Sequence, residues 1–175
     1  DYLLEHFWDE TEKNFFFTAD NHEKLIIRTK NIYDLSLPSG NSVAAGALLR
    51  LYHITHDKRY FDASLKIMES LSTMAAENPF GFGQLLNVIY MYLKKPTEIT
   101  MINYINKELC TYLEKRFLPE SILVGVDTKE NLKDLQPLPF FAGKEFVETK
   151  TKVYVCKDFT CSLPLETIDE VEKLL

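Results

Sequence analysis

The chain has 175 residues, enough for one domain or for one domain and a small appendage. The formal net charge is −6 and no basic run exists, which argues against a nucleic-acid or anionic-membrane surface, because such surfaces need clustered Lys and Arg. No apolar stretch approaches the roughly 20 residues of a membrane span. The three cysteines do not make the disulfide framework of a small secreted domain, so we expect a reducing, cytoplasmic setting.

The N-terminal segment is predicted to contain a helix end, a hairpin and a polar turn. Residues 1–10 have a helical pattern without an initiator Met or signal-peptide features, so we interpret the chain as a piece of a longer protein. Residues 15–18 and 25–29 are β-prone runs separated by turn residues, which indicates a β-hairpin. The turn DLSLPSGNS, residues 34–42, then leads into an apolar helical pattern.

Three helices are predicted to follow this turn. The first covers residues 43–53, and Asn41 or Ser42 can cap it. The second begins at Asp57, and the very short link makes the two helices an antiparallel hairpin. The third follows the Pro- and Gly-containing residues 79–83 and stops before Pro96.

The pattern changes after Pro96. Residues 98–102 and 121–126 are predicted strands, and Asn103 is predicted to cap the helix between them. A strand–helix–strand unit of this length normally forms a right-handed parallel crossover.

The last third is predicted to be mostly loop over residues 127–150, with a final strand at 152–155. Thr167 begins the last helix, and Glu170 three residues later completes a capping-box pattern. On residue pattern alone the chain is mostly helical, with a small α/β appendage.

Polar residues in the turn are the first candidates for a ligand site. A sharp turn that ends in helix-capping groups exposes N–H donors and hydroxyl groups together, which suits sugar hydroxyls or a carboxylate. The alternative is that these residues only shape the turn and cap the helix. The candidates are Asp34, Ser39, Asn41 and Ser42.

Cys156 and Cys161 are the second candidate, as a C-x4-C pair between strand and helix. They are structural thiols, a reversible disulfide or half of a zinc site. Zinc needs four ligands, and no second Cys or His pair follows. The spacing also differs from the C-x-x-C of redox motifs.

His53 and His56 are the third candidate, because two histidines three residues apart on a helix can share a metal. The alternative is a pair of surface histidines near a helix C-terminus, where positive charge is favoured. No nucleotide-binding or hydrolase motif occurs, so we expect no cofactor, no metal site and no identifiable catalytic residue.

Several sequence blocks together resemble the C-terminal part of the YyaL, or spermatogenesis-associated thioredoxin-domain, family. The resemblance covers nearly the whole chain, and the order and spacing of the blocks match as well as their content. The two strongest blocks are PSGNSVAA at residues 38–45 and the YVC-x4-CS-x-P pattern at residues 154–164.

The resemblance implies a fold that residue pattern does not provide. Family members look like a thioredoxin-like domain joined to an (α/α)6 toroid. This toroid is the six-hairpin architecture shared with glycosidases and sugar epimerases. Residues 1–96 would be the last helical hairpins of that toroid, with a β-hairpin at its mouth, and residues 97–175 the α/β appendage. The thioredoxin-like domain and the other hairpins would be absent, and the exposed inner helix faces favour self-association.

The resemblance also implies roles for individual residues. Asp34, Ser39, Asn41 and Ser42 would line the mouth of the toroid, and Arg28 would reach in from the preceding strand. Cys156 and Cys161 match the family's C-terminal cysteine pair.

Two functional hypotheses follow. The first is a module that binds or modifies carbohydrate by general acid–base chemistry, with most catalytic groups on absent hairpins. The alternative is a non-catalytic scaffold or an interaction module that responds to thiol redox state through Cys156 and Cys161.

Overall fold

The computed structural model describes residues 1–23, 26–158 and 160–175. Over these residues the chain forms two compact units. The first unit comprises Asp1–Tyr52 and Asp57–Tyr90, and the second comprises His53–His56 and Met91–Leu175.

The first unit begins with a short helix and a small hairpin. Helix α1 is Tyr2–His6, and strands β1 (Trp8–Asp9) and β2 (Asn14–Phe15) pair antiparallel. Lys13 has a φ of 57° and its N–H donates to the carbonyl of Asp9 at 2.9 Å, which turns the chain back on itself.

The hairpin predicted over residues 15–18 and 25–29 is therefore displaced toward the N-terminus. Residue 25 of the second predicted run, and residue 24 before it, lie outside the described residues. Between the two predicted runs the backbone N–H of Phe17 donates to the carbonyl of Thr29 at 2.8 Å.

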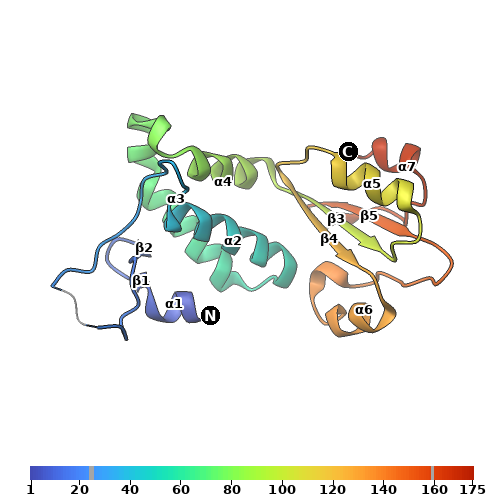
Figure 1. Cartoon of the computed structure of the whole chain (residues 1–175), viewed down its shortest axis with the longest axis horizontal. Helices are drawn as coiled ribbons and strands as arrows, with labels where there is room; N and C mark the ends of the chain where they lie inside the picture. Colours follow the sequence, from blue (N-terminus) through green and yellow to red (C-terminus); the bar gives the residue numbers. More distant parts are fainter. Residues whose placement is uncertain (24–25, 159) are drawn as a thin grey trace. The chain divides into compact units, whose positions relative to one another are not determined.

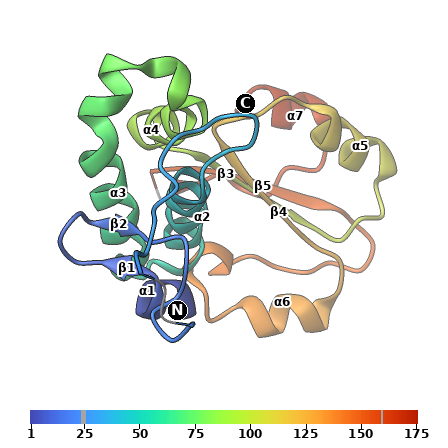
Figure 2. The same ribbon diagram turned by 60° about the vertical axis from the view of Figure 1, so that its left-hand side comes forward.

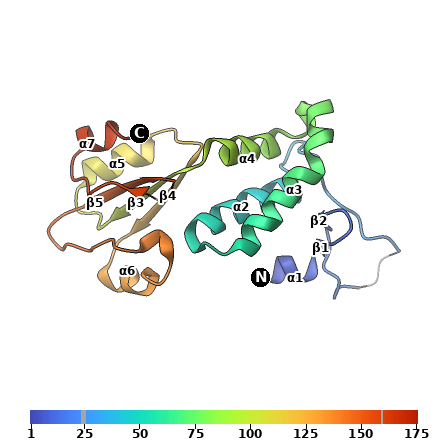
Figure 3. The ribbon, with the colours of Figure 1, turned by 180° about the vertical axis from the view of Figure 1, so that it is seen from behind.

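From Gly40 onward the first unit is mainly helical, with α2 (Gly40–Thr55), α3 (Lys58–Glu77), the 3₁₀ helix η1 (Pro79–Gly81) and α4 (Gly83–Lys94). The predicted helical hairpin is confirmed. Two residues join α2 and α3, which lie side by side in Figure 3, and the Ser64 hydroxyl of α3 donates to the carbonyl of Ala45 in α2 at 2.8 Å. Asp57 caps α3 as predicted, since its carboxylate accepts from the N–H of Arg59 at 2.9 Å.

The second unit is built on a four-stranded mixed sheet. Its strands are β3 (Thr97–Ile102), β4 (Ser121–Val126), β5 (Lys152–Lys157) and β6 (Thr160–Cys161), and their order in the sheet is β4-β3-β5-β6. β3 and β4 run parallel with Thr97 opposite Ser121, so the predicted parallel crossover is confirmed. β5 is antiparallel to β3, and the short β6 is antiparallel to β5.

Helices cover both faces of this sheet (Figures 1 and 2). α5 (Lys107–Lys115) and α7 (Ile168–Glu172) lie on one face, and α6 (Lys129–Leu135) lies on the other. Because successive side chains in a strand point to opposite faces, alternate residues of β3 and β5 lie on the face covered by α5 and α7 or on the face covered by α6. The hydrophobic core between the sheet and helices α5 and α7 consists of Ile99, Met101, Leu109, Cys110, Leu113, Val153, Val155 and Val171.

The predicted fold class is wrong. About 47% of the described residues are helical and 15% are in strands, distributed over a two-stranded and a four-stranded sheet, so the chain is mixed α/β. A mainly α fragment of an (α/α)6 toroid does not describe it. The expectation came from the resemblance to a toroid family, whereas the residue pattern after Pro96 already favoured a sheet.

Two local predictions in the second unit also need correction. Asn106, not Asn103, caps α5, because its side chain accepts from the N–H of Leu109 at 3.1 Å. Asn103 instead has a φ of 62° and bonds to the segment before β5 through the carbonyl of Val147 at 2.9 Å. Residues 127–150, predicted as mostly loop, contain α6 and the 3₁₀ helix η2 (Pro139–Phe141).

Candidate functional site

Asp34 is a buried structural carboxylate. Its Oδ1 accepts a hydrogen bond from the backbone N–H of Ser39 at 2.7 Å. Its Oδ2 accepts from the N–H groups of Gln84 and Leu85, at 2.9 and 3.0 Å. These two N–H groups lie in the first turn of α4, where backbone donors lack partners within the helix. Asp34 therefore joins the polar turn to the start of α4.

Ser39 and Ser42 form a helix cap. α2 begins at Gly40, and the Ser39 Oγ accepts from the N–H of Ser42 at 3.0 Å. The Ser39 hydroxyl also donates to the Ser42 Oγ at 2.8 Å, and both residues are fully buried. The cap is thus Ser39 rather than the predicted Asn41 or Ser42, because the helix starts three residues earlier than its apolar stripe.

Asn41 holds two distant backbone segments together. Its Oδ1 accepts from the N–H of Phe15 at 2.7 Å, and its Nδ2 donates to the carbonyls of Phe15 and Asn31 at 3.0 and 2.9 Å. Arg28 has a comparable role, since its guanidinium donates to the carbonyl of Thr18 at 2.7 Å. The same guanidinium lies 4.0 Å from the ring centroid of Phe16.

The polar turn therefore directs its hydrogen-bonding groups into the chain. Asp34, Ser39 and Ser42 are brought together, and Arg28 bonds to a different backbone segment. A carbohydrate site at this turn stays a prediction, and the toroid mouth on which it depended is not part of the fold.

Cys156 and Cys161 form a disulfide with an S–S distance of 2.08 Å. They are directly paired residues of β5 and β6. Cys156 is 0% exposed, whereas Cys161 belongs to the exposed surface. Cys110 is a free thiol in the core, and burial raises its pKa, so it is less readily ionised than an ordinary thiol.

Lys144 places a buried ammonium group beside this disulfide. Its Nζ lies 3.9 Å from the Sγ of Cys161 and donates to the carbonyl of Phe140. The rings of Phe140 and Tyr154 also face the ammonium, with centroids 5.2 and 5.8 Å away. Lys144 is only 5% exposed, and burial lowers its pKa, an effect that the negative charge of Glu98 opposes.

Glu98 and His53 complete the charged surroundings. Glu98 lies opposite Cys156 in the β3–β5 register, is buried, and has its Oε1 2.8 Å from the Nδ1 of His53. The side chain of His53 is 12% exposed, so it is not the surface histidine of the alternative interpretation. We call Cys156, Cys161, Lys144, Glu98 and His53 the cysteine site.

Sequence reasoning missed Glu98 and Lys144. Glu98 is the one charge within the strand TEITMI, which is a weak signal that a neighbour compensates it. Lys144 carries no comparable signal, because most lysines are exposed.

Among the described residues, no group of three or more His, Cys, Asp or Glu side chains is arranged to hold a metal. No helix in the described ranges has the length and apolar character needed to cross a bilayer.

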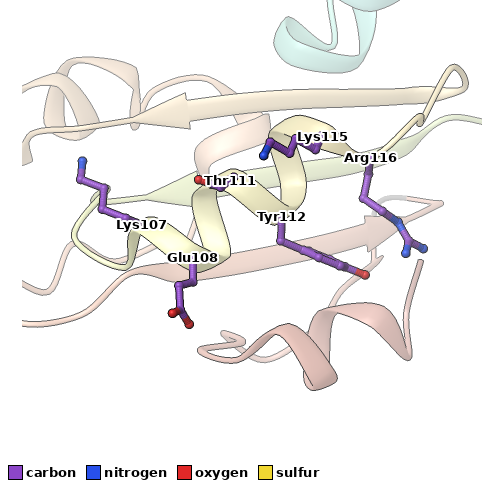
Figure 4. Close-up of a pocket in the computed structure, with 6 residues that line it drawn as sticks. All are labelled: Lys107, Glu108, Thr111, Tyr112, Lys115 and Arg116. Atoms are coloured by element: carbon purple, nitrogen blue, oxygen red, sulfur yellow. The ribbon is translucent and has the colours of Figure 1, made fainter.

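A separate hollow of about 580 Å³ lies along α5 and is drawn in Figure 4. All its lining side chains come from α5 or the residue after it, and Arg116 among them lies 3.4 Å from Glu172 of α7. The hollow is thus an open helix surface, and we assign it no chemistry. Its lining comprises Lys107, Glu108, Thr111, Tyr112, Lys115 and Arg116.

Comparison with known proteins gives relatives but no matching family model. The chain is 25% identical over 174 residues to spermatogenesis-associated protein 20 of Rattus norvegicus and to that of Homo sapiens, covering 97% of this chain and 22% of each relative. An uncharacterized protein of Caenorhabditis elegans is 24% identical over 173 residues, covering 96% of this chain and 23% of that protein. The chain therefore spans about a fifth of the length of these curated relatives. The resemblance predicted from the sequence is confirmed, since the chain is similar over nearly all its length to the C-terminal part of spermatogenesis-associated protein 20.

Proposed function

We propose that this chain is a thiol-responsive module whose Cys156–Cys161 disulfide is reversibly reduced and reformed. The observation that carries the proposal is the bond between a buried and an exposed cysteine, with the Lys144 ammonium 3.9 Å from the exposed sulfur. Exposed disulfides near positive charge are the labile, regulatory or catalytic ones, whereas structural disulfides resist reduction.

The reaction is an exchange with an external dithiol. A thiolate of the dithiol attacks the Sγ of Cys161, the bond between Cys156 and Cys161 breaks, and Cys156 leaves as a thiolate that takes up a proton. The second thiolate of the dithiol then attacks the dithiol sulfur that is bonded to Cys161, which releases Cys161 as a thiolate. Two electrons and two protons pass to the protein, and the dithiol becomes a disulfide.

A dithiol protein of the thioredoxin type is the partner that the sequence resemblance suggests. The disulfide lies at an edge of the sheet, because β6 is the last strand in the order β4-β3-β5-β6. A partner can therefore approach Cys161 without opening the sheet. Reduction of the disulfide would break the covalent link between β5 and β6. A surface formed by these strands would then respond to redox state.

Redox titration tests the proposal. The protein is equilibrated in buffers of reduced and oxidised dithiothreitol or glutathione, trapped by alkylation and weighed by mass spectrometry. We expect the pair to titrate reversibly with a midpoint potential less negative than about −300 mV, a value below which structural disulfides typically fall.

Cysteine variants identify the titrating pair. The Cys110→Ala variant should titrate as the wild type does, because Cys110 is outside the cysteine site. The Cys156→Ser and Cys161→Ser variants should each lose the two-electron transition. A midpoint more negative than about −300 mV would assign the disulfide a purely structural role.

A further inference from the structure

We propose that Lys144 is a positioning residue that holds Cys161 as a thiolate in the reduced protein, so that Cys161 attacks partner disulfides and Cys156 resolves the product. The inference rests on the proposed function and assigns unequal roles to the two sulfurs. It also makes a disulfide-bearing partner the substrate class of the reduced form.

Accessibility separates the two sulfurs. Cys161 belongs to the exposed surface of β6, whereas Cys156 is 0% exposed at the end of β5. A partner sulfur must approach along the axis of the bond that it attacks, which the buried Cys156 does not permit. The first exchange therefore falls on Cys161 in either direction of the reaction.

Electrostatics favours the same sulfur. In the disulfide state the Lys144 ammonium contacts a carbonyl, two aromatic rings and the Sγ of Cys161. Reduction would place a thiolate in the position of that sulfur and supply the buried ammonium with a close anionic partner. Two opposite charges about 4 Å apart interact strongly even at the intermediate dielectric of a protein surface. A neighbouring lysine is a known cause of a lowered thiol pKa.

The remaining charges around the pair do not cancel this effect. Glu98 on β3 faces Cys156 and is bonded to His53, which draws its carboxylate toward the imidazole. In the turn after β5, Asp158 lies 2.8 Å from the ammonium of Lys95. Lys157 at the end of β5 donates to the carbonyl of Leu174, 3.4 Å away. Within the ranges that the structure describes, Lys144 is thus the cation held against the exposed sulfur.

The reduced module would work as follows. The Cys161 thiolate attacks one sulfur of a partner disulfide R–S–S–R, forming a Cys161–S–R mixed disulfide and expelling RS⁻. Cys156 loses its proton and attacks the Sγ of Cys161, which expels the second RS⁻. The partner gains two electrons and, with two protons, becomes two thiols, while the protein returns to its disulfide.

The pH dependence of alkylation tests the role of Lys144. The chain carrying Cys110→Ala is reduced with a dithiol, desalted and treated with iodoacetamide between pH 5 and 10, and modification of Cys161 is followed by peptide mass spectrometry. We expect Lys144→Met to raise the pKa of Cys161 and to slow its alkylation at pH 6.5 by about tenfold, one pKa unit. Met matches the length of the lysine side chain without its charge, and Lys144→Arg should restore fast alkylation.

Lys152→Met is the matched control. Lys152 is also buried, but its Nζ bonds to Glu145 at 3.3 Å, so its loss should leave the Cys161 profile unchanged. Identical profiles for the wild type and Lys144→Met would overturn this inference while leaving a reversible redox titration intact. A wild-type pKa for Cys161 at the ordinary thiol value of about 8.5 would overturn it even if Lys144→Met did not fold. Failure of the pair to reoxidise would instead remove the proposed function.

Discussion

At the scale of single residues, Asp34 illustrates how a polar turn can be structural rather than exposed. One carboxylate accepts three backbone N–H groups, from Ser39, Gln84 and Leu85. Each of these donors would lack that acceptor in Asp34→Ala, and unsatisfied buried donors cost about 1–3 kcal/mol each. We expect the variant to lower the free energy of unfolding by roughly 3 kcal/mol, measured by urea denaturation.

The control for Asp34 is another aspartate of the same unit. Asp62 is exposed on α3, so Asp62→Ala should change stability by no more than about 0.5 kcal/mol. Equal stability of Asp34→Ala and wild type would show that the carboxylate does not hold the turn. Any loss of ligand binding by Asp34→Ala must accordingly be measured against its loss of stability.

At the scale of elements, helix α7 was the most predictable part of the chain. The capping box at Thr167 and Glu170 is confirmed, with each side chain bonded to the backbone of the other end of the turn. The caps of α2 and α5 were misplaced by up to three residues, at Ser39 and Asn106. At the start of each of these helices, two or more residues that can cap a helix lie close together in the sequence. Which of them forms the cap depends on contacts with backbone that is distant in the sequence.

The α7 capping box also predicts a pH effect. The Glu170 carboxylate accepts from the backbone N–H of Glu166 at 2.9 Å, and this bond, followed by those with Thr167, lowers the pKa of Glu170 below its usual value. A carboxyl group whose pKa is lower in the folded state stabilises that state above its unfolded pKa, and the effect is lost as the pH falls through the folded pKa. We expect Glu170→Gln to flatten the acid limb of the stability profile below about pH 4.5, measured by denaturant unfolding at a series of pH values.

The comparison variant for this effect is Glu148→Gln, outside the α7 capping box. It should leave the acid limb of the profile as steep as in the wild type. Parallel acid limbs for Glu170→Gln and wild type would contradict a stabilising role for the ionised Glu170.

At the scale of the whole molecule, sequence reasoning succeeded where structure is local and failed where it is not. The helical hairpin and the parallel crossover depend on apolar periods and short connections within one stretch of chain. The cysteine site draws on residues from 53 to 161, and no spacing rule relates Lys144 or Glu98 to the cysteines. The toroid was wrong because it was transferred from a family rather than obtained from the pattern of strands after Pro96.

The division into two units leads to a final prediction about which unit responds to reduction of the disulfide. The disulfide and the rest of the cysteine site belong to the second unit, and α3 belongs to the first. A disulfide that closes a loop of about five residues stabilises by about 2 kcal/mol in the chain-entropy model. We expect reduction to accelerate amide hydrogen exchange in β5 by up to about 30-fold, the equivalent of that free energy, and to leave exchange in α3 unchanged.

The experiment compares oxidised and reduced protein by hydrogen exchange and mass spectrometry. A Cys156→Ala/Cys161→Ala double variant, treated with the same dithiol, reports any effect of the reagent itself and should show no change. If exchange in α3 accelerated as much as in β5, the two units would unfold together and the redox signal would extend through the chain. If exchange in β5 stayed constant, the disulfide would not stabilise its own sheet. A response confined to the second unit is the result expected of a switch that acts on one surface and leaves the helices of the first unit in place.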